Sequence, residues 1–448
     1  MKILLTTHQF LPYSSAGTEI LTHSVALSLI KRGHTVQVFT GHPSTEKLAD
    51  EERFDEYNID GIHTYRFHHS YAPMGKQTSL LEIGYDNHLA ASHFEKILGK
   101  FKPDLVHFFH LDRLGTGLID RAVEAEVPCF MTPTDFWTIC PTGRLLLEDG
   151  RLCDGPSASA GNCLKHFIET TQKGWPSSLS TLLPTSLADR IVDLTQRDLI
   201  PIYPKRHEVI ALAKRLPTNI SRLNKLNGIT APNQFMKELL VKYGVKSELI
   251  QIHAFGLKDA PATTTQQALK RQPPLRIAFI GTLAPHKGCH VLIEAFKMLP
   301  SERATLKIYG KPDDFPEYMK KLEKLSEEQS SIEFCGTFPN SEIAQILSAL
   351  DVLVIPSVWY ENTPLVLYSA QAARRPVIVS NLPGLTAVVE HEKNGLTFTP
   401  GDSADLAKQL FRLINEQSLW SKLAAQAYQP RTIEQYTDDL VNMWDLKS

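Results

Sequence analysis

Two stretches of the chain repeat one local order: an apolar strand, a turn of small residues, an amphipathic helix and a second strand. In the first stretch, residues 3–7 are predicted as a strand, Leu21, Val25 and Leu29 recur on one helix face, and residues 35–40 form the next strand. A helix between two strands brings the chain back to the same end of the sheet, so the strands run parallel. The sequence therefore predicts a parallel sheet covered by helices.

The alternation stops at residues 259–274, where Pro261, Pro273 and Pro274 indicate a linker, and it restarts with a strand at residues 276–280. The fold class is therefore α/β, with two doubly wound, Rossmann-like domains. Ligands of such sheets bind beyond the carboxyl ends of the strands. We expect the main site in a cleft between the two domains.

We predict a first domain over residues 1–258, a linker over 259–274, a second domain over 275–429, and a C-terminal helix at 430–448 that completes the first domain. Residues 155–225 do not follow the alternation and are interpreted as a solvated helical insertion. An alternative interpretation is an acceptor or membrane-surface patch, because basic amphipathic segments attract anionic lipid. The basic residues concerned are Lys205, Arg206, His207, Lys214 and Arg215.

Composition narrows the possible functions. Hydrophobic residues make up 42% and charged residues 21%, as in an ordinary globular protein. Lys and Arg number 47 against 49 Asp and Glu, so the basic excess typical of a nucleic-acid-binding protein is missing. The sequence has no transmembrane run, no signal-peptide pattern at its start and, with six Cys in 448 residues, no disulfide framework. We expect a cytoplasmic protein with no nucleic-acid partner.

Eight short segments carry a more specific signal through their order and spacing. They are Ser14–Glu19, Arg32–His34, Asp104–His107, Asp135–Pro141, Gly281–Gly288, Pro356–Leu367, Arg375–Ser380 and Asn394–Gly395. Together they resemble the retaining glycosyltransferases of family 4. The resemblance implies the GT-B architecture, in which two Rossmann-like domains face each other across a cleft.

The resemblance also implies an activity. The enzyme would move a hexose from a nucleotide-sugar, UDP- or GDP-linked, to a glycan or lipid-linked acceptor in cell-surface polysaccharide or glycoconjugate synthesis. It would contact the inner membrane surface peripherally. Transfer would retain the anomeric configuration, with the leaving phosphate accepting the acceptor's proton while the protein positions both substrates and stabilises charge. No Asp-x-Asp motif occurs in the sequence, which fits a reaction without a catalytic metal.

The resemblance places the donor site mainly in the second half. Lys287 lies on a turn that enters a helix, where its ammonium and the backbone N–H groups around Gly288 can bind a diphosphate. Glu361 matches the first Glu of the family's Glu-x7-Glu motif and is expected to face the donor. The predicted donor-binding residues are Gly17, Gly281, Thr282, Lys287, Gly288, Glu361, Asn362, Thr363, Pro364, Leu365 and Ser369.

The second half also departs from the family pattern. Ser369 stands at the second Glu of the motif, where a hydroxyl can still bond to ribose but with less reach and no charge. Thr282 replaces a frequent Arg, Arg374 a usual Gly and Ala387 a frequent Glu. Three interpretations stay open: altered ribose contacts in an active enzyme, an unusual donor, or a domain that has lost catalysis.

In the first half, His110 resembles the histidine that contacts the donor sugar, although His107 lies within the same segment and the register of the match is open. Either histidine could instead be a satisfied strand-end residue. Asp135 resembles the Asp of a His-Asp-Tyr/Phe-Trp segment, with Thr134 in place of the His; it either orients an acceptor hydroxyl or caps a turn. We predict Glu361, Lys287, His110 and Asp135 as the catalytic residues.

Cys140, Cys153, Cys163 and His166 form a Cys-x12-Cys-x9-Cys-x2-His series. Three thiols and one imidazole suit a structural Zn²⁺ site, which would fix the loop after Asp135. The alternative is a set of buried thiols without metal. For the whole chain, two rival functions also stay open: a GT-B protein that has lost transfer and assists a partner transferase, and a nucleotide-sugar epimerase.

Overall fold

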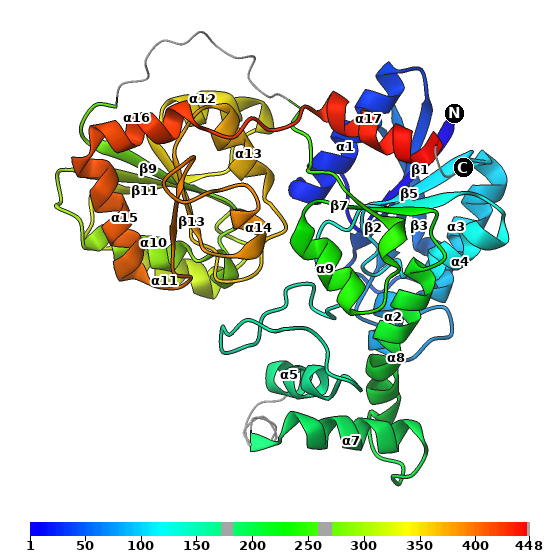
Figure 1. The fold of residues 1–448 in the computed structure, drawn as a ribbon. Coiled ribbons are helices and arrows are strands. Elements are labelled where there is room, and N and C mark those ends of the chain that lie inside the picture. Colours follow the sequence, from blue (N-terminus) through cyan, green and yellow to red (C-terminus); the bar gives the residue numbers. More distant parts are fainter. Residues whose placement is uncertain (172–181, 259–270, 446–448) are drawn as a thin grey trace. The chain divides into compact units, whose positions relative to one another are not determined.

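The computed structural model describes residues 1–171, 182–258 and 271–445, so most of the predicted linker at 259–274 lies outside the described residues. The chain divides into two compact units (Figure 1). The first unit contains Met1–Ala254 and the C-terminal segment that begins at Ile433. The second contains Phe255–Thr432.

The first unit is built on an eight-stranded sheet in the order β3-β4-β2-β1-β5-β6-β7-β8. β3 and β4 pair antiparallel, and the other strand pairs of this sheet are parallel, as the βαβ pattern predicts. The strands are β1 (Lys2–Thr7), β2 (Thr35–Pro43), β3 (Phe54–Ile59), β4 (Ile62–His69), β5 (Leu105–Phe108), β6 (Cys129–Met131), β7 (Gly228–Ala231) and β8 (Ile250–Ile252).

The β3–β4 hairpin was not predicted, because its strands carry polar residues on their exposed face. Asp60 and Gly61 connect them, both with positive φ (47° and 80°), as a two-residue turn that matches the strand twist requires. The helices of this unit are α1 (Gly17–Lys31), α2 (Leu80–Tyr85), α3 (His88–Phe101), α4 (Gly117–Glu124), α5 (Gly161–Thr171), α7 (Thr185–Gln196), α8 (Arg206–Leu223), α9 (Gln234–Lys242) and α17 (Ile433–Asp445), with short turns η1 (Asp50–Glu52) and η2 (Ser247–Leu249).

The C-terminal helix α17 lies beside α1 (Figure 1). Arg32 donates to the Asp438 carboxylate at 2.6 Å and to the Glu434 carbonyl at 2.7 Å. Deeper in the unit, the Tyr436 hydroxyl lies 3.2 Å from the Thr132 hydroxyl beyond the end of β6. The last described helix therefore packs on the unit formed by the start of the chain.

The second unit has a six-stranded, all-parallel sheet in the order β11-β10-β9-β12-β13-β14. Strands β12 and β13 are buried at every position and apolar except for Ser380, as expected for a sheet covered on both faces. The strands are β9 (Leu275–Ile280), β10 (Ala304–Tyr309), β11 (Ile332–Gly336), β12 (Val352–Ile355), β13 (Val377–Ser380) and β14 (Leu396–Phe398). The helices are α10 (Cys289–Lys297), α11 (Pro316–Ser326), α12 (Ile343–Ser348), α13 (Leu365–Ala372), α14 (Pro383–Thr386), α15 (Ser403–Asn415) and α16 (Gln417–Ala425), with turns η3 (Pro285–Lys287) and η4 (Asn340–Glu342).

Helices α5, α7 and α8 belong to the region that the sequence marks as a helical insertion. They pack on one another around a small apolar cluster of Val192, Val209 and Ala213, with Leu164 and Tyr203 against it (Figure 1). Within the described residues, no helix combines the length and apolar character needed to span a bilayer.

Candidate functional site

In the second unit, Lys287 and Glu361 form a close ion pair. Lys287 ends η3, in the loop after β9, and Glu361 lies in the loop after β12, the neighbouring strand. The Lys287 ammonium lies 2.8 Å and 3.1 Å from the two Glu361 carboxylate oxygens and 4.7 Å from the centre of the Trp359 ring. The two predicted residues therefore meet at the carboxyl edge of the sheet.

Glu361 is held firmly, whereas Lys287 is accessible. The Ser357 hydroxyl and the Trp359 indole N–H donate to Glu361 Oε1 at 2.5 Å and 2.9 Å. The Glu361 side chain is 5% exposed and that of Lys287 is 23% exposed. The carboxylate thus accepts from three donors, one of which is the partly exposed Lys287 side chain.

Two glycines allow neighbouring segments to approach the loop that carries Glu361. Gly288 has φ +71°, and a Cβ there would lie 1.8 Å from the Pro356 carbonyl oxygen. A Cβ on Gly384 would lie 1.5 Å from the carbonyl oxygen of Glu361 itself. Both positions need glycine because backbone packs directly against backbone.

The remaining predicted donor residues lie around this pair. Asn362 and Thr363 are buried, Pro364 is the N-cap of α13, and Leu365 begins that helix. Thr363 has φ +62°, and its hydroxyl donates to the Gly384 carbonyl at 3.0 Å. Gly281 and Thr282 directly follow β9 and lie at least partly open to solvent.

Ser369, on α13, bonds within its own helix. Its hydroxyl donates to the Leu365 carbonyl at 3.1 Å, the bond that serine commonly makes one turn back. The side chain is partly exposed. In this structure the hydroxyl is therefore not aimed at a ligand, although rotation about one bond would release it.

In the first unit, His110 and Asp135 form a second pair. They follow β5 and β6, which are neighbours in the sheet, and His110 Nε2 lies 3.0 Å from Asp135 Oδ2. In its neutral form the ring accepts the backbone N–H of Asp112 at Nδ1 (3.1 Å), so Nε2 carries the proton, close to Asp135 but without hydrogen-bond geometry to it. Burial opposes a charge on His110, but the carboxylate of Asp135 outweighs it and the pKa of His110 is raised.

His107 has a different place in the structure, inside the core. It is fully buried, its Nε2 lies 2.9 Å from the Thr132 hydroxyl, and its Nδ1 accepts the Trp444 indole N–H at 3.2 Å. Burial lowers the pKa of His107 to about 3, so the ring is neutral. His107 is a satisfied core histidine that ties α17 to the sheet, and His110 is the candidate site residue.

The sequence did not single out two further titratable side chains, His8 and Glu19, as site residues. His8 directly follows β1, and its ring centre lies 4.1 Å from that of His110. Glu19, in the first turn of α1, is 1% exposed; its Oε1 accepts from the Ser14 hydroxyl at 3.1 Å and lies 3.8 Å from His8 Nε2. The Glu19 Oε2 atom has no hydrogen-bond partner among the described residues.

Burial shifts the pKa values of several side chains around His110. It raises the pKa of Glu19 and lowers the pKa of His8, so both groups shift toward their neutral forms. His69, at the end of β4, is also neutral, because burial lowers its pKa to about 3. The first unit therefore presents a compact polar group, His8, Glu19, His110 and Asp135, which can exchange hydrogen bonds with a hydroxylated ligand.

Gly17 begins α1, as the predicted strand–turn–helix order requires. A Cβ at this position would meet no atom within 4 Å, and the residue is exposed. No neighbouring atom in the described chain requires glycine at this position. The predicted donor-binding role of Gly17 therefore depends on a ligand that comes close to the backbone here.

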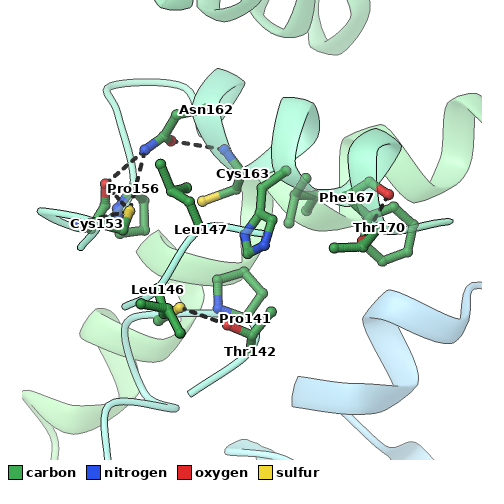
Figure 2. A pocket seen from close by; sticks show the side chains of 14 residues that line it. Pro141, Thr142, Leu146, Leu147, Cys153, Pro156, Asn162, Cys163, Phe167 and Thr170 are labelled. Carbon is green, nitrogen blue, oxygen red and sulfur yellow. Dashed lines mark hydrogen bonds between the residues drawn. The ribbon is translucent and has the colours of Figure 1, made fainter. Parts of the chain in front are cut away.

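The cysteine series converges on a cavity of about 30 Å³, lined by Cys140, Cys153, Cys163 and His166 together with apolar side chains (Figure 2). Burial raises the pKa of Cys163, and the thiols of Cys140 and Cys153 are near enough to add to this effect. The described residues nevertheless contain no group of three or more His, Cys, Asp or Glu side chains placed to hold a metal ion. The cysteines are free thiols, and the zinc site stays a prediction.

Only some residues of the predicted basic patch in the insertion are exposed to solvent. Arg215 is 4% exposed and donates to the backbone carbonyls of Trp137 and Ile139, so it supports the loop after Asp135 from inside. Arg206 pairs with Asp198. Lys205, His207 and Lys214 are exposed. The prediction of a continuous basic patch was wrong for Arg215, because sequence alone does not show which helix face is buried.

Residues 274–416 match the family model described as glycosyl transferases group 1. An uncharacterised glycosyltransferase of Methanocaldococcus jannaschii is 33% identical over 141 residues, which are 31% of this chain and 36% of that protein. The amylovoran biosynthesis glycosyltransferase AmsK of Erwinia amylovora is 25% identical over 230 residues, 49% of this chain and 53% of the relative. The chain thus spans about a third to a half of the length of these curated relatives.

Solved structures match over nearly the full length. Anabaena HepE, determined in complex with UDP and glucose, has a TM-score of 0.64 at 16% identity and covers 99% of both chains. Sucrose-phosphate synthase of Thermosynechococcus elongatus has a TM-score of 0.63 at 16% identity, covering 99% of this chain and 98% of that one. The fold is therefore that of the GT-B glycosyltransferases, and the second unit carries the group 1 sequence signature.

Proposed function

We propose that the protein is a retaining glycosyltransferase of family 4 that moves a hexose from a nucleotide-sugar to a glycan or lipid-linked acceptor. The observation that carries the proposal is the Lys287–Glu361 pair. It lies at the carboxyl edge of the second sheet, within the region that matches group 1 glycosyl transferases. Parallel sheets of this kind bind their ligands at that edge.

The donor half of the reaction follows from the charges of the pair. A departing nucleoside diphosphate carries growing negative charge, and Lys287 offers an exposed ammonium to stabilise it. Glu361 stays in place because Ser357 and Trp359 hold it even when the ammonium turns toward phosphate. We assign Glu361 to the hydroxyls of the donor sugar, with the donor linked to UDP or GDP.

The acceptor half is assigned to the group around His110. Asp135 and His110 can orient an acceptor hydroxyl, and the leaving phosphate would take its proton as the new bond forms on the same face of the sugar. In this mechanism the chain supplies positioning and charge stabilisation, with no protein nucleophile and no catalytic metal. HepE, whose structure contains UDP and glucose, supports a nucleotide-sugar donor for this fold.

The cellular role we propose is synthesis of cell-surface polysaccharide or glycoconjugate on the cytoplasmic side of the membrane. The match to AmsK, an amylovoran biosynthesis glycosyltransferase, supports this assignment. The departure at Ser369 favours one alternative, a protein of this fold that binds nucleotide or glycan and assists a partner transferase.

A thermal-shift panel of UDP-, GDP-, ADP- and CMP-linked sugars tests the proposal. A donor present at about 100 times its Kd stabilises the folded protein by about 2.7 kcal/mol, which moves the melting temperature measurably. We expect one UDP- or GDP-linked sugar to shift wild type and to shift Lys287→Ala much less. A shift without transfer in the presence of acceptor extract would favour the assisting protein, and conversion of donor without acceptor would favour an epimerase.

A further inference from the structure

Arg113 and Tyr71 form a stacked pair at the carboxyl edge of the first sheet. Tyr71 lies in the loop after β4 and Arg113 in the loop after β5. Strands β4, β2, β1 and β5 run parallel, so both loops leave the same edge of the sheet. The central carbon of the Arg113 guanidinium lies 4.0 Å from the centre of the Tyr71 ring, and Tyr71 is 73% exposed. An open aromatic ring therefore holds a cation at the edge where such sheets bind ligands.

The charge of Arg113 has no close partner. The side chain is 18% exposed, and its Nε atom is buried without a hydrogen-bond partner among the described residues. Asp112 is the one acidic residue of the described chain that comes within 4.0 Å, and its Oδ1 lies 4.0 Å from Nε, beyond hydrogen-bond distance. A guanidinium that is largely removed from water needs acceptors for its N–H groups, so this arginine suits an anionic ligand.

The backbone holds Arg113 in a conformation that residues other than glycine rarely adopt. Its φ is +66°. The Arg113 N–H donates to the Gly84 carbonyl at 3.1 Å, and the side-chain amide of buried Asn87 donates to the Arg113 carbonyl at 2.9 Å. Glycine or asparagine would adopt this conformation with less strain. An arginine here therefore indicates that its side chain, and not only the turn, has a function.

Arg113 lies near the polar group around His110. Burial lowers the pKa of His69, and the positive charge of Arg113 adds to this effect. Burial also lowers the pKa of His8, with His110 and His69 adding to it. The buried Nδ1 atom of His69 has no hydrogen-bond partner within the described chain. The cation thus lies close to the side chains that we assign to the acceptor.

We propose that Arg113 and Tyr71 bind an anionic group of the acceptor, a carboxylate or a phosphate, and so select an acidic acceptor. The inference rests on the proposed function, which assigns this part of the first unit to the acceptor. A guanidinium fixed by stacking keeps N–H groups in its plane that fit two oxygens of a carboxylate or a phosphate. The open part of the Tyr71 ring can pack on the adjoining sugar, while an acceptor hydroxyl reaches His110 and Asp135.

A thermal-shift titration of the full-length protein tests the proposal without requiring transfer. The probes are glucuronate and glucose 6-phosphate, with glucose as the neutral control. At least one of the two anions should stabilise wild type more than glucose does. This effect should persist in Lys287→Ala, which removes the candidate phosphate site of the second unit. In Arg113→Gln the apparent affinity for the anion should fall about tenfold, through loss of charged hydrogen bonds.

Further variants separate charge, geometry and stacking. Arg113→Lys keeps the charge without the planar fork and should bind with intermediate affinity. Tyr71→Ala should weaken anion binding about threefold, because it removes the stacked ring. The matched control is Arg121→Gln, which removes an exposed arginine paired with Glu124 on α4 and should bind as wild type does. Circular dichroism and a melt without ligand check that each variant is folded.

The two probes also distinguish the source of the charge. A response to glucuronate alone assigns a carboxylate, and a response to glucose 6-phosphate alone assigns a phosphate. In either case Arg113→Gln should keep the thermal shift that the nucleotide-sugar donor produces. A wild type that binds the anion through Arg113 but binds no donor would contradict the proposed function while supporting the anion site.

Three outcomes would overturn the proposal. The first is a wild type that neither anion stabilises more than glucose does. The second is equal anion binding by wild type and Arg113→Gln. The third is anion binding that Lys287→Ala removes and Arg113→Gln keeps, which would assign the anion to the second unit.

Discussion

In the second unit, Lys287 and Glu361 meet from two neighbouring loops, whereas in the first unit His8, Glu19 and the His110–Asp135 pair converge from four separate segments. The first arrangement combines one partly exposed cation with one fixed carboxylate. In the second, Glu19 and His110 are buried, His8 and Asp135 are partly exposed, and burial drives His8 and Glu19 toward their neutral forms. A pair with a partly exposed cation suits a diphosphate, and a group of polar donors and acceptors suits sugar hydroxyls.

The largest effect should follow from Lys287→Ala. Loss of one group that stabilises transition-state charge slows turnover by about 10²–10³-fold. Nucleotide release from the donor measures the rate, and the thermal melt checks folding. Lys320→Ala, which removes an exposed lysine paired with Glu317 on α11, is the matched control and should leave turnover unchanged. Turnover of Lys287→Ala close to wild type would exclude the lysine from the donor site.

Gly288→Ala should destabilise the second unit by more than about 2 kcal/mol. An alanine at φ +71° carries its own strain, and its Cβ would lie 1.8 Å from the Pro356 carbonyl oxygen. Gly401→Ala is the control, because Gly401 has a similar φ of +80° but open space around its Cβ. Urea unfolding compares the two variants, and equal losses would show that the loops do not pack as closely as described.

Glu19→Gln should change how stability depends on pH. Burial raises the pKa of Glu19 in the folded state above its pKa in the unfolded chain. The contribution of Glu19 to the free energy of unfolding is therefore fully present below the unfolded-state pKa and is lost as pH rises through the folded-state pKa. Glutamine does not ionise, so the variant does not lose this stability as pH rises. Toward neutral pH it should therefore be more stable than wild type. Melting temperatures across the acid-to-neutral range measure the difference, with exposed Glu51→Gln as the control. Parallel curves for wild type and Glu19→Gln would contradict a carboxyl group whose pKa burial raises.

The smallest effect is expected at Ser369. Its hydroxyl bonds to Leu365 in the same helix, so Ser369→Ala should change the KM for donor by less than about twofold. Ser369→Glu restores the carboxylate of the family motif and should lower that KM by about tenfold through charged hydrogen bonds to ribose. A higher KM for Ser369→Glu would show that the proposed donor is bound without a contact at this position.

The two sites also differ in how well the sequence predicted them. Lys287 and Glu361 lie in short motifs whose local order and spacing are readable, and both occupy the expected edge of the sheet. His8 and Glu19 were missed because their meaning depends on which strand ends are adjacent in space, which no local pattern shows. Arg215 looked like a surface charge, yet it is buried against backbone carbonyls.

The parallel strands were predictable as apolar runs between helices, whereas the β3–β4 hairpin, with polar residues on its open face, was not. Three of the cysteines line one cavity, but their spacing in the sequence does not fix the directions of their side chains, so the zinc site stays a prediction.

Nucleotide release is the measurement that tests the central claim most directly. The purified protein is incubated with each UDP- and GDP-linked sugar, with and without a glycan or lipid-linked acceptor extract. The account predicts release of the nucleoside diphosphate from one donor, faster with acceptor and about 10²–10³-fold slower in Lys287→Ala. Release that does not differ between wild type and Lys287→Ala, or no release together with no thermal shift by any donor, would contradict it.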